Sequence, residues 1–91
     1  MTELPDLPNL GPVLIHTLNK VNIYTVEELR TKGSERAYLA IKEIDPTACL
    51  SKLYALEGAV QGIRWHLLPA DRKKELKTFF DHHRSDEQMA E

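Results

Sequence analysis

A short turn near the start of the sequence, Asn9-Leu10-Gly11, has residue types that can bind an anion. Asparagine and glycine tolerate the positive φ that tight turns need, and Pro12 is favoured at the first position of a helix. The first amides of a helix have no partner within it, and the helix dipole makes this end partly positive. The candidate donors are the backbone amides of Leu10, Gly11, Val13 and Leu14. The pattern therefore predicts a site for a phosphate, such as that of DNA, or for another anion.

The same turn also has a purely structural interpretation, in which Asn9 and Gly11 serve only the backbone conformation. Pro12 contributes no N–H, and Lys20 is the first cation after the turn. Cations matter because charge neutralisation supplies most of the non-specific affinity for nucleic acids. Both interpretations stay open. The candidate anion or nucleic-acid site comprises Asn9, Leu10, Gly11, Val13 and Lys20.

A second candidate surface is a basic run on the last predicted helix. Its members share one stretch of that helix and are Arg72, Lys73, Lys74 and Lys77. Such a run opposite an apolar stripe is typical of a solvated helix face. The alternative is a surface for nucleic acid or for an acidic partner.

Glu57 and Arg64 fall inside the apolar face of a long predicted helix. A carboxylate there must be paired or hydrogen-bonded, because burying a bare charge is costly. We expect Glu57 to act as a structural polar anchor, either paired with Arg64 or accepting from the start of a neighbouring short helix. The alternative is a lone general base or ligand, but no carboxylate or histidine lies three or four residues from Glu57 to assist acid–base catalysis.

Other reactive residues show no catalytic or metal-binding pattern. The four histidines are scattered except for His82-His83, and neighbouring helical residues diverge by about 100°, so this pair cannot simply chelate one ion. The single cysteine, Cys49, excludes an internal disulfide and is expected to pack in the core. The sequence has no phosphate-binding glycine loop and no nucleophile elbow. We therefore expect no enzyme activity, no metal and no cofactor.

The first half of the chain predicts three short helices that position the turn. Pro12 begins the first, whose buried stripe contains Leu14 and Leu18. Thr25 and Glu28 form a capping box for the second, which Gly33 ends. Ser34 then caps a third helix that continues to about residue 44.

The second half predicts two longer helices. Asp45-Pro46 has the residue types of a helix start, and the helix that follows is expected to reach Gly62, to be the longest, and to form the centre of the core. Its apolar face contains Cys49, Leu53, Leu56, Val60 and Ile63. Pro69 begins a fifth helix, ending near His82, with an inner stripe that contains Leu76, Phe79 and Phe80. Trp65, between these two helices, is expected to cover the core.

Composition and length bound the class of protein. The chain has 91 residues, 42% of them hydrophobic and 29% charged, with a net charge of −2, which argues against a strongly electrostatic nucleic-acid binder. Residues 46–80 nevertheless carry six basic and three acidic side chains. No apolar run approaches the length of a membrane span, and we expect a cytoplasmic protein. Residues 1–83 are expected to form one domain, and residues 84–91 a disordered acidic tail.

Four segments of the sequence resemble the TfoX C-terminal domain family: Leu7–Pro12, Asn22–Leu29, Cys49–Ala59 and Gly62–Trp65. The resemblance covers about residues 4–80, and the Tyr54–Ala59 block is its most specific part. The family is bacterial and is associated with regulators of DNA-transformation competence. The resemblance implies a compact helical domain that also occurs alone, without enzyme activity.

The Pro-Asn-Leu-Gly turn is also similar to helix-hairpin-helix units and to the C-terminal domain of the bacterial RNA polymerase α subunit. Those domains bind DNA backbone partly through this turn. Asn22 stands here where a glycine is usual in them.

These observations predict an all-α bundle of about five helices whose N-terminal half is like a helix-hairpin-helix. We expect a non-enzymatic binding module that serves competence or transcription regulation through contacts with nucleic-acid backbone or with the transcription machinery. The alternative is a protein–protein module or a homodimer that has no role with nucleic acid.

Overall fold

The computed structural model describes residues 3–89, with side chains through His83. It contains five α-helices and two short 3-10 helices, and the described residues include no strand. The elements in chain order are η1 (Leu4–Asp6), α1 (Pro12–Lys20), α2 (Val26–Lys32), α3 (Ser34–Ile44), α4 (Leu50–Gln61), η2 (Trp65–Leu67) and α5 (Ala70–Met89). The predicted all-α class is confirmed. No helix of the described residues is long and apolar enough to cross a membrane.

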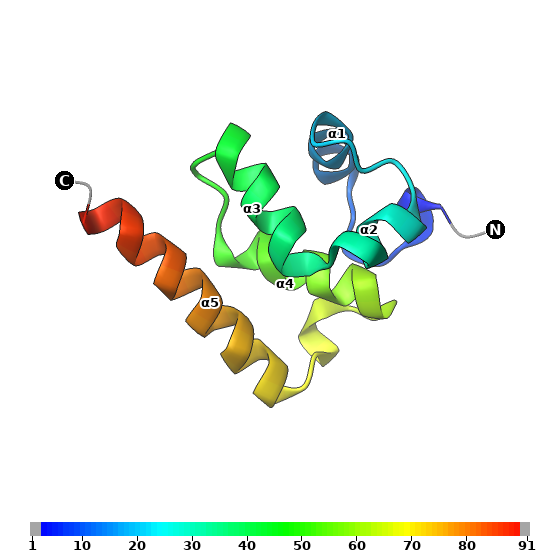
Figure 1. Cartoon of the computed structure of the whole chain (residues 1–91). Coiled ribbons are helices and arrows are strands. Elements are labelled where there is room, and N and C mark those ends of the chain that lie inside the picture. Colours follow the sequence, from blue (N-terminus) through cyan, green and yellow to red (C-terminus); the bar gives the residue numbers. More distant parts are fainter. Residues whose placement is uncertain (1–2, 90–91) are drawn as a thin grey trace.

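Helix α4 forms the centre of the core, as the sequence predicts. It contacts α2, α3, η2 and α5 (Figure 1). Leu53, Leu56 and Ala59 of this helix are fully buried, because neighbouring elements cover more than one of its faces. The prediction that this is the longest helix is wrong, since α4 has 12 residues and α5 has 20.

Helix α1 begins and packs as its sequence predicts. Gly11 is its N-cap, Pro12 is its first residue, and Leu14 and Leu18 enter the core. After the helix, Asn22 adopts a positive φ of 66°. This conformation explains how asparagine replaces the glycine that is usual there, since asparagine tolerates the left-handed region better than most residues.

The predicted capping box of α2 is present. The amide of Glu28 donates to the hydroxyl of Thr25 at 3.1 Å, and the amide of Thr25 donates to the carboxylate of Glu28 at 3.0 Å. The backbone hydrogen bonds from Tyr24 and Thr25 lower the pKa of Glu28 below its usual value. Gly33 ends α2 with a φ of 85° and also caps α3. The prediction that Ser34 caps α3 is therefore wrong, because its hydroxyl has a partner elsewhere.

The connection between α3 and α4 also differs from the prediction. Asp45 ends α3 instead of starting α4. Its carboxylate accepts from the amide and hydroxyl of Thr47, which favours a turn over a helix at this point. Helix α4 begins only at Leu50, with Cys49 as its N-cap. Cys49 is exposed, so the prediction that it packs in the core is wrong.

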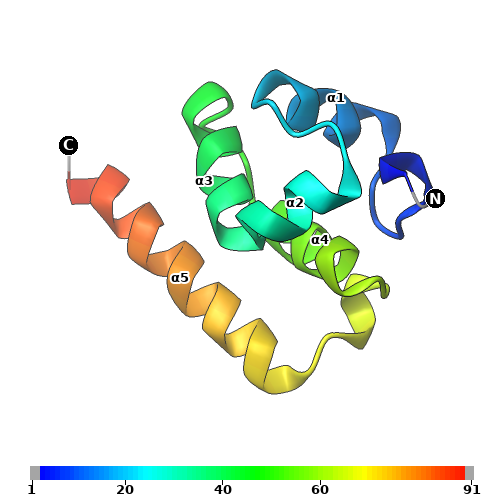
Figure 2. The ribbon, with the colours of Figure 1, turned by 45° about the vertical axis from the view of Figure 1, so that its right-hand side comes forward.

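Helix α5 lies along one side of the molecule (Figures 1 and 2). Leu76 is fully buried, and Phe79 and Phe80 pack against the core. The Phe80 ring lies 6.0 Å from that of Tyr38 in α3. The backbone of α5 continues to Met89, beyond the predicted end near His82. Residues 90–91 lie outside the described part, and the disorder expected for residues 84–91 stays a prediction.

Candidate functional site

An open groove of about 550 Å³ lies between the start of α1, helix α4 and η2. Its lining residues come from three segments that are far apart in the sequence: Asn9, Gly11, Val13, Leu14, Ser51, Lys52, Ala55, Arg64, Trp65 and His66. Among these residues are two cations and an imidazole, and none carries a carboxylate. By contrast, the groove of about 300 Å³ between η1, α1 and α2 is lined by Glu3 and Glu27 and by no lysine or arginine. Charge is therefore segregated on a chain whose net charge is −2.

The predicted turn forms one wall of this groove. Gly11 caps α1 in an extended conformation, with φ −86° and ψ 173°. Val13 and Leu14 occupy the second and third positions of α1, where amides have no acceptor within the helix. Leu10 is buried and does not line the groove.

Asn9 has a structural task that the sequence does not reveal. Its φ is 74°, and its side chain spans the connection after α4. Nδ2 donates to the carbonyl of Ile63 at 2.9 Å, and Oδ1 accepts from the amide of Trp65 at 3.1 Å. Both amide positions are therefore engaged with the protein, so Asn9 fixes the wall of the groove instead of offering its side chain to a ligand.

Gly58 lets this contact form. A Cβ at position 58 would lie 2.5 Å from Nδ2 of Asn9 and 2.8 Å from the carbonyl oxygen of Ile63. Only glycine provides the space for the turn to approach α4 so closely.

The cations that line the groove are not the one that the sequence predicts for the turn. Lys52 extends from α4 and donates to Asp45 at 3.0 Å, with its side chain 30% exposed. Arg64 and His66 follow α4 and are both exposed. Lys20 lies in the last turn of α1, at the end opposite Gly11. The structure therefore separates Lys20 from the predicted site, because a helix of nine residues is about 13 Å long.

Aromatic rings line the groove beside these cations. The Trp65 ring stacks on Tyr54, with centroids 5.6 Å apart, and on His66, with centroids 4.0 Å apart. Nζ of Lys73 lies 5.7 Å from the centre of the Trp65 ring and donates to the carbonyl of His66 at 3.2 Å. Trp65 packs against the core as expected, and it also forms part of the groove surface.

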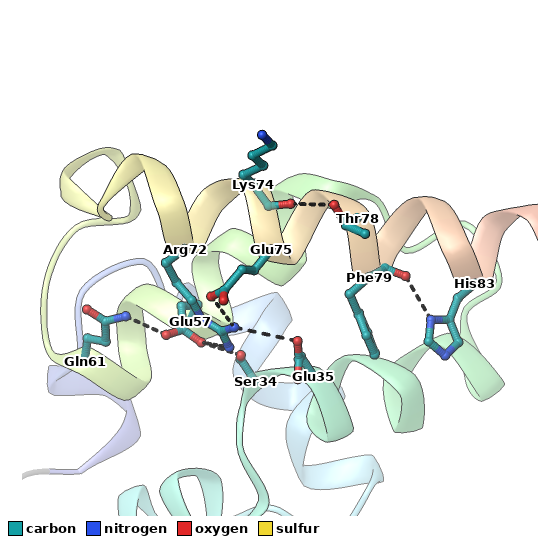
Figure 3. Close-up of polar contacts among 10 residues, drawn as sticks. All are labelled: Ser34, Glu35, Glu57, Gln61, Arg72, Lys74, Glu75, Thr78, Phe79 and His83. Carbon is teal, nitrogen blue, oxygen red and sulfur yellow. Dashed lines mark hydrogen bonds and ion pairs between the residues drawn. The ribbon is translucent and has the colours of Figure 1, made fainter.

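The basic run of α5 is not a uniform cationic face. Arg72 points into the molecule, and Lys73 bonds to the η2 backbone. Lys77 pairs with Asp81 at 2.9 Å. Lys74 extends away from the protein (Figure 3). The prediction that all four face solvent is wrong for Arg72, since its position brings it against α4.

Glu57 is the buried polar anchor that the sequence predicts, but its cation is Arg72 and not Arg64. Glu57 is 7% exposed and accepts from Nη2 of Arg72 at 3.1 Å (Figure 3). It also accepts from the hydroxyl of Ser34 and from Nε2 of Gln61. Arg64 follows Gly62, which ends α4 in a left-handed conformation, and it lines the groove beside the turn.

The protein holds Glu57 in its ionised form. Burial raises the pKa of this carboxyl, but the hydrogen bonds from Arg72, Ser34 and Gln61 together outweigh burial and lower the pKa below its usual value. The hydrogen bond to Glu57 in turn raises the pKa of Arg72. A carboxylate with three donors is suited to joining helices, and the cluster connects α3, α4 and α5 (Figure 3).

The described residues contain no group of three or more histidine, cysteine, aspartate or glutamate side chains that could hold a metal ion. The chemistry available in the groove is therefore that of backbone amides, two cations and stacked rings. Such groups bind anions and aromatic ligands.

Comparison of this sequence with those of known proteins identifies its family. The family model of the TfoX C-terminal domain matches residues 1–80. The chain belongs to the TfoX C-terminal domain family. Protein Sxy of Escherichia coli (strain K12) is 35% identical to it over 79 residues, which cover 87% of this chain. The chain spans only 38% of the length of Sxy.

Two crystal structures from Listeria monocytogenes have the same fold as this TfoX C-terminal domain. One, of an uncharacterized protein, is 54% identical, with a TM-score of 0.84 over 86% of this chain and 89% of that one. The other, of a protein of unknown function, is 53% identical, with a TM-score of 0.85 over 87% and 98% of the two chains.

Proposed function

We propose that this TfoX C-terminal domain is a non-enzymatic module that binds nucleic-acid backbone through the groove beside Gly11. The observation that supports the proposal is the lining of the groove, which has Lys52, Arg64 and His66 and no carboxylate among its described residues. The free amides at the start of α1 add donors for a phosphate. The binding event would serve competence or transcription regulation, in keeping with the regulators with which the family is associated.

Two cations predict modest affinity with a clear dependence on salt. If Lys52 exchanges its ion pair with Asp45 for one phosphate and Arg64 neutralises a second, the logarithm of the binding constant falls with the logarithm of salt concentration with a slope of about −2. Fluorescence anisotropy with labelled duplex and single-stranded oligonucleotides measures this slope. Arg64→Gln should weaken binding and reduce the slope by about one.

Lys74→Gln is the matched control, because Lys74 is exposed on α5 and does not line the groove. It should leave both affinity and slope unchanged. The proposal is contradicted if neither probe binds at low salt, or if Lys74→Gln weakens binding as much as Arg64→Gln does.

A protein partner or a second copy is the other candidate occupant of this face. Val13 is 77% exposed and Leu67 is 70% exposed, and exposed apolar side chains of this size favour a protein interface. Light scattering that gives twice the 10.4 kDa mass of the chain would support a homodimer. Val13→Ser should then shift the dimer toward monomer, and an unchanged mass for this variant would argue against a homodimer through this face.

A further inference from the structure

The wall of the groove near η2 presents an aromatic ring on a fixed support. His66 is exposed and stacks on Trp65 with an interplanar angle of 28°. Trp65 is half-buried and stacks on Tyr54 at 18°. An exposed ring on a nearly parallel ring from the core has the arrangement of a platform on which a further flat group can stack.

Hydrogen bonds from two other segments hold this platform in place. Asn9 accepts from the backbone amide of Trp65, and Lys73 donates to the backbone carbonyl of His66. The hydroxyl of Tyr54 donates to the carbonyl of Lys73 at 3.4 Å. These bonds fix the backbone that carries the rings, and the stacking of His66 on Trp65 and of Trp65 on Tyr54 orients the rings, which lowers the entropic cost of stacking a further group.

The platform and the cations line the same groove. Lys52 and Arg64 line it together with Trp65 and His66. Alternation of phosphate-binding cations with an exposed ring is how proteins bind single-stranded nucleic acid, because every unpaired base has a face that can stack. In a duplex, the neighbouring base pairs already cover these faces.

We propose that the groove takes single-stranded nucleic acid, with phosphates at Lys52 and Arg64 and one unpaired base stacked on the ring of His66. This inference rests on the proposed function, because it needs the groove to bind backbone. It adds the class of ligand: a strand with unpaired bases is preferred over a duplex and over a backbone that has no bases.

The test compares three probes with the full chain: a thymidine strand of about ten nucleotides, an abasic strand of the same length, and a duplex of the same length. Trp65 is the only tryptophan, so its fluorescence reports on the groove, and anisotropy gives the affinities. The thymidine strand should bind about tenfold more tightly than the abasic strand. His66→Ala should remove this difference between the two strands, whereas His66→Phe should retain it.

His82→Ala is the control, since His82 is exposed on α5, and it should behave as the wild type. Thermal unfolding followed by circular dichroism establishes that each variant is folded. Equal affinity for the thymidine and abasic strands overturns this inference and leaves the proposed function standing. Absence of binding to all three probes overturns both, and displacement of the strand by a poly-glutamate peptide of equal affinity assigns the groove to an acidic protein partner.

Discussion

Glu57 of α4 and Arg72 of α5 form an ion pair of 3.1 Å although Glu57 is only 7% exposed. The pair joins the central helix to the C-terminal helix. The hydroxyl of Ser34, at the start of α3, also donates to Glu57 and so connects the third helix to the pair. Arg72 also reaches Glu35 at 3.7 Å and Glu75 at 3.3 Å. The position of α5 therefore depends on one buried carboxylate as well as on apolar packing.

Glu57→Gln should destabilise the protein because it removes the charge of a buried pair and keeps the size of the side chain. We expect a loss of about 1–3 kcal/mol in the free energy of unfolding, below the cost for a fully buried pair because Arg72 is partly exposed. Urea unfolding measures the loss. Glu75→Gln is the control, since that carboxylate is 66% exposed, and its effect should be within about 0.5 kcal/mol.

The difference in stability between the wild type and Glu57→Gln should depend on pH. The pKa of Glu57 lies below its usual 4.5 in the folded protein, so its stabilising contribution is present above pH 4.5 and is lost as pH falls through the lowered pKa. The wild type should therefore be more stable than Glu57→Gln near neutral pH, and the two stability curves should converge in acid. Parallel curves from about pH 6 to about pH 3 would contradict this account.

Gly58→Ala should destabilise the protein although alanine favours helices. Helix propensity alone would add about 1 kcal/mol, but the new methyl would lie 2.8 Å from the carbonyl of Ile63 and closer still to Asn9. We expect a net loss of about 1–3 kcal/mol. Thermal unfolding checks this, with Ser51→Ala at an exposed position of α4 as the control that should not destabilise.

The alanine methyl at position 58 would contact both the Asn9 side chain and the Ile63 carbonyl, and Asn9→Gly removes only the first of these contacts. It keeps the positive φ at position 9 and removes the side-chain amide. The double variant should therefore lose less stability than the sum of the single variants. Strict additivity would contradict the contact between Asn9 and residue 58.

Cys49 should be more reactive than an ordinary thiol. Desolvation by the neighbouring atoms raises its pKa, but the amides of Lys52 and Ser51 at the start of α4, with the Ser51 hydroxyl, lower it below the usual 9.0. The rate of alkylation by iodoacetamide should therefore reach half its plateau below pH 9.0, and Ser51→Ala should raise this midpoint. A midpoint at or above 9.0 in the folded wild type would be the contrary result.

Gly11→Asp should separate folding from binding. The Cβ at this position meets nothing within 4 Å, and aspartate is a good N-cap. The free energy of unfolding should stay the same or rise by up to about 1 kcal/mol. The carboxylate would stand in the groove and reduce oligonucleotide affinity about tenfold at low salt. Gly11→Asn provides an equivalent cap without charge, so it should weaken binding less than Gly11→Asp does.

The local features of the fold could be predicted because they depend on neighbouring residues. The start of α1 at Pro12 and the capping box of Thr25 and Glu28 follow from spacings of a few residues. The start of α4 could not be placed, because Asp45 and Pro46 suit a turn as well as a helix. The hydrogen bonds from the amide and hydroxyl of Thr47 to the Asp45 carboxylate favour the turn.

The partners in the candidate site could not be predicted because they are far apart in the sequence. Periodicity places Glu57 on a buried face but does not say that Arg72, fifteen residues later, lies opposite. Asn9 and Ile63 are 54 residues apart, so the sequence alone does not predict that Arg64 and His66 lie beside the turn. One signal was available: a glycine inside a helix, here Gly58, often marks a close approach of another segment.

We expect the groove beside Gly11 to be the surface that binds nucleic acid. Titration of the isotope-labelled protein with a single-stranded oligonucleotide, followed by the chemical shifts of the backbone amides, tests it directly. The largest shifts should be those of Gly11, Val13, Lys52 and Arg64. Shifts confined to the outer face of α5 around Lys74 and Lys77, or no shifts at low salt, would contradict the account.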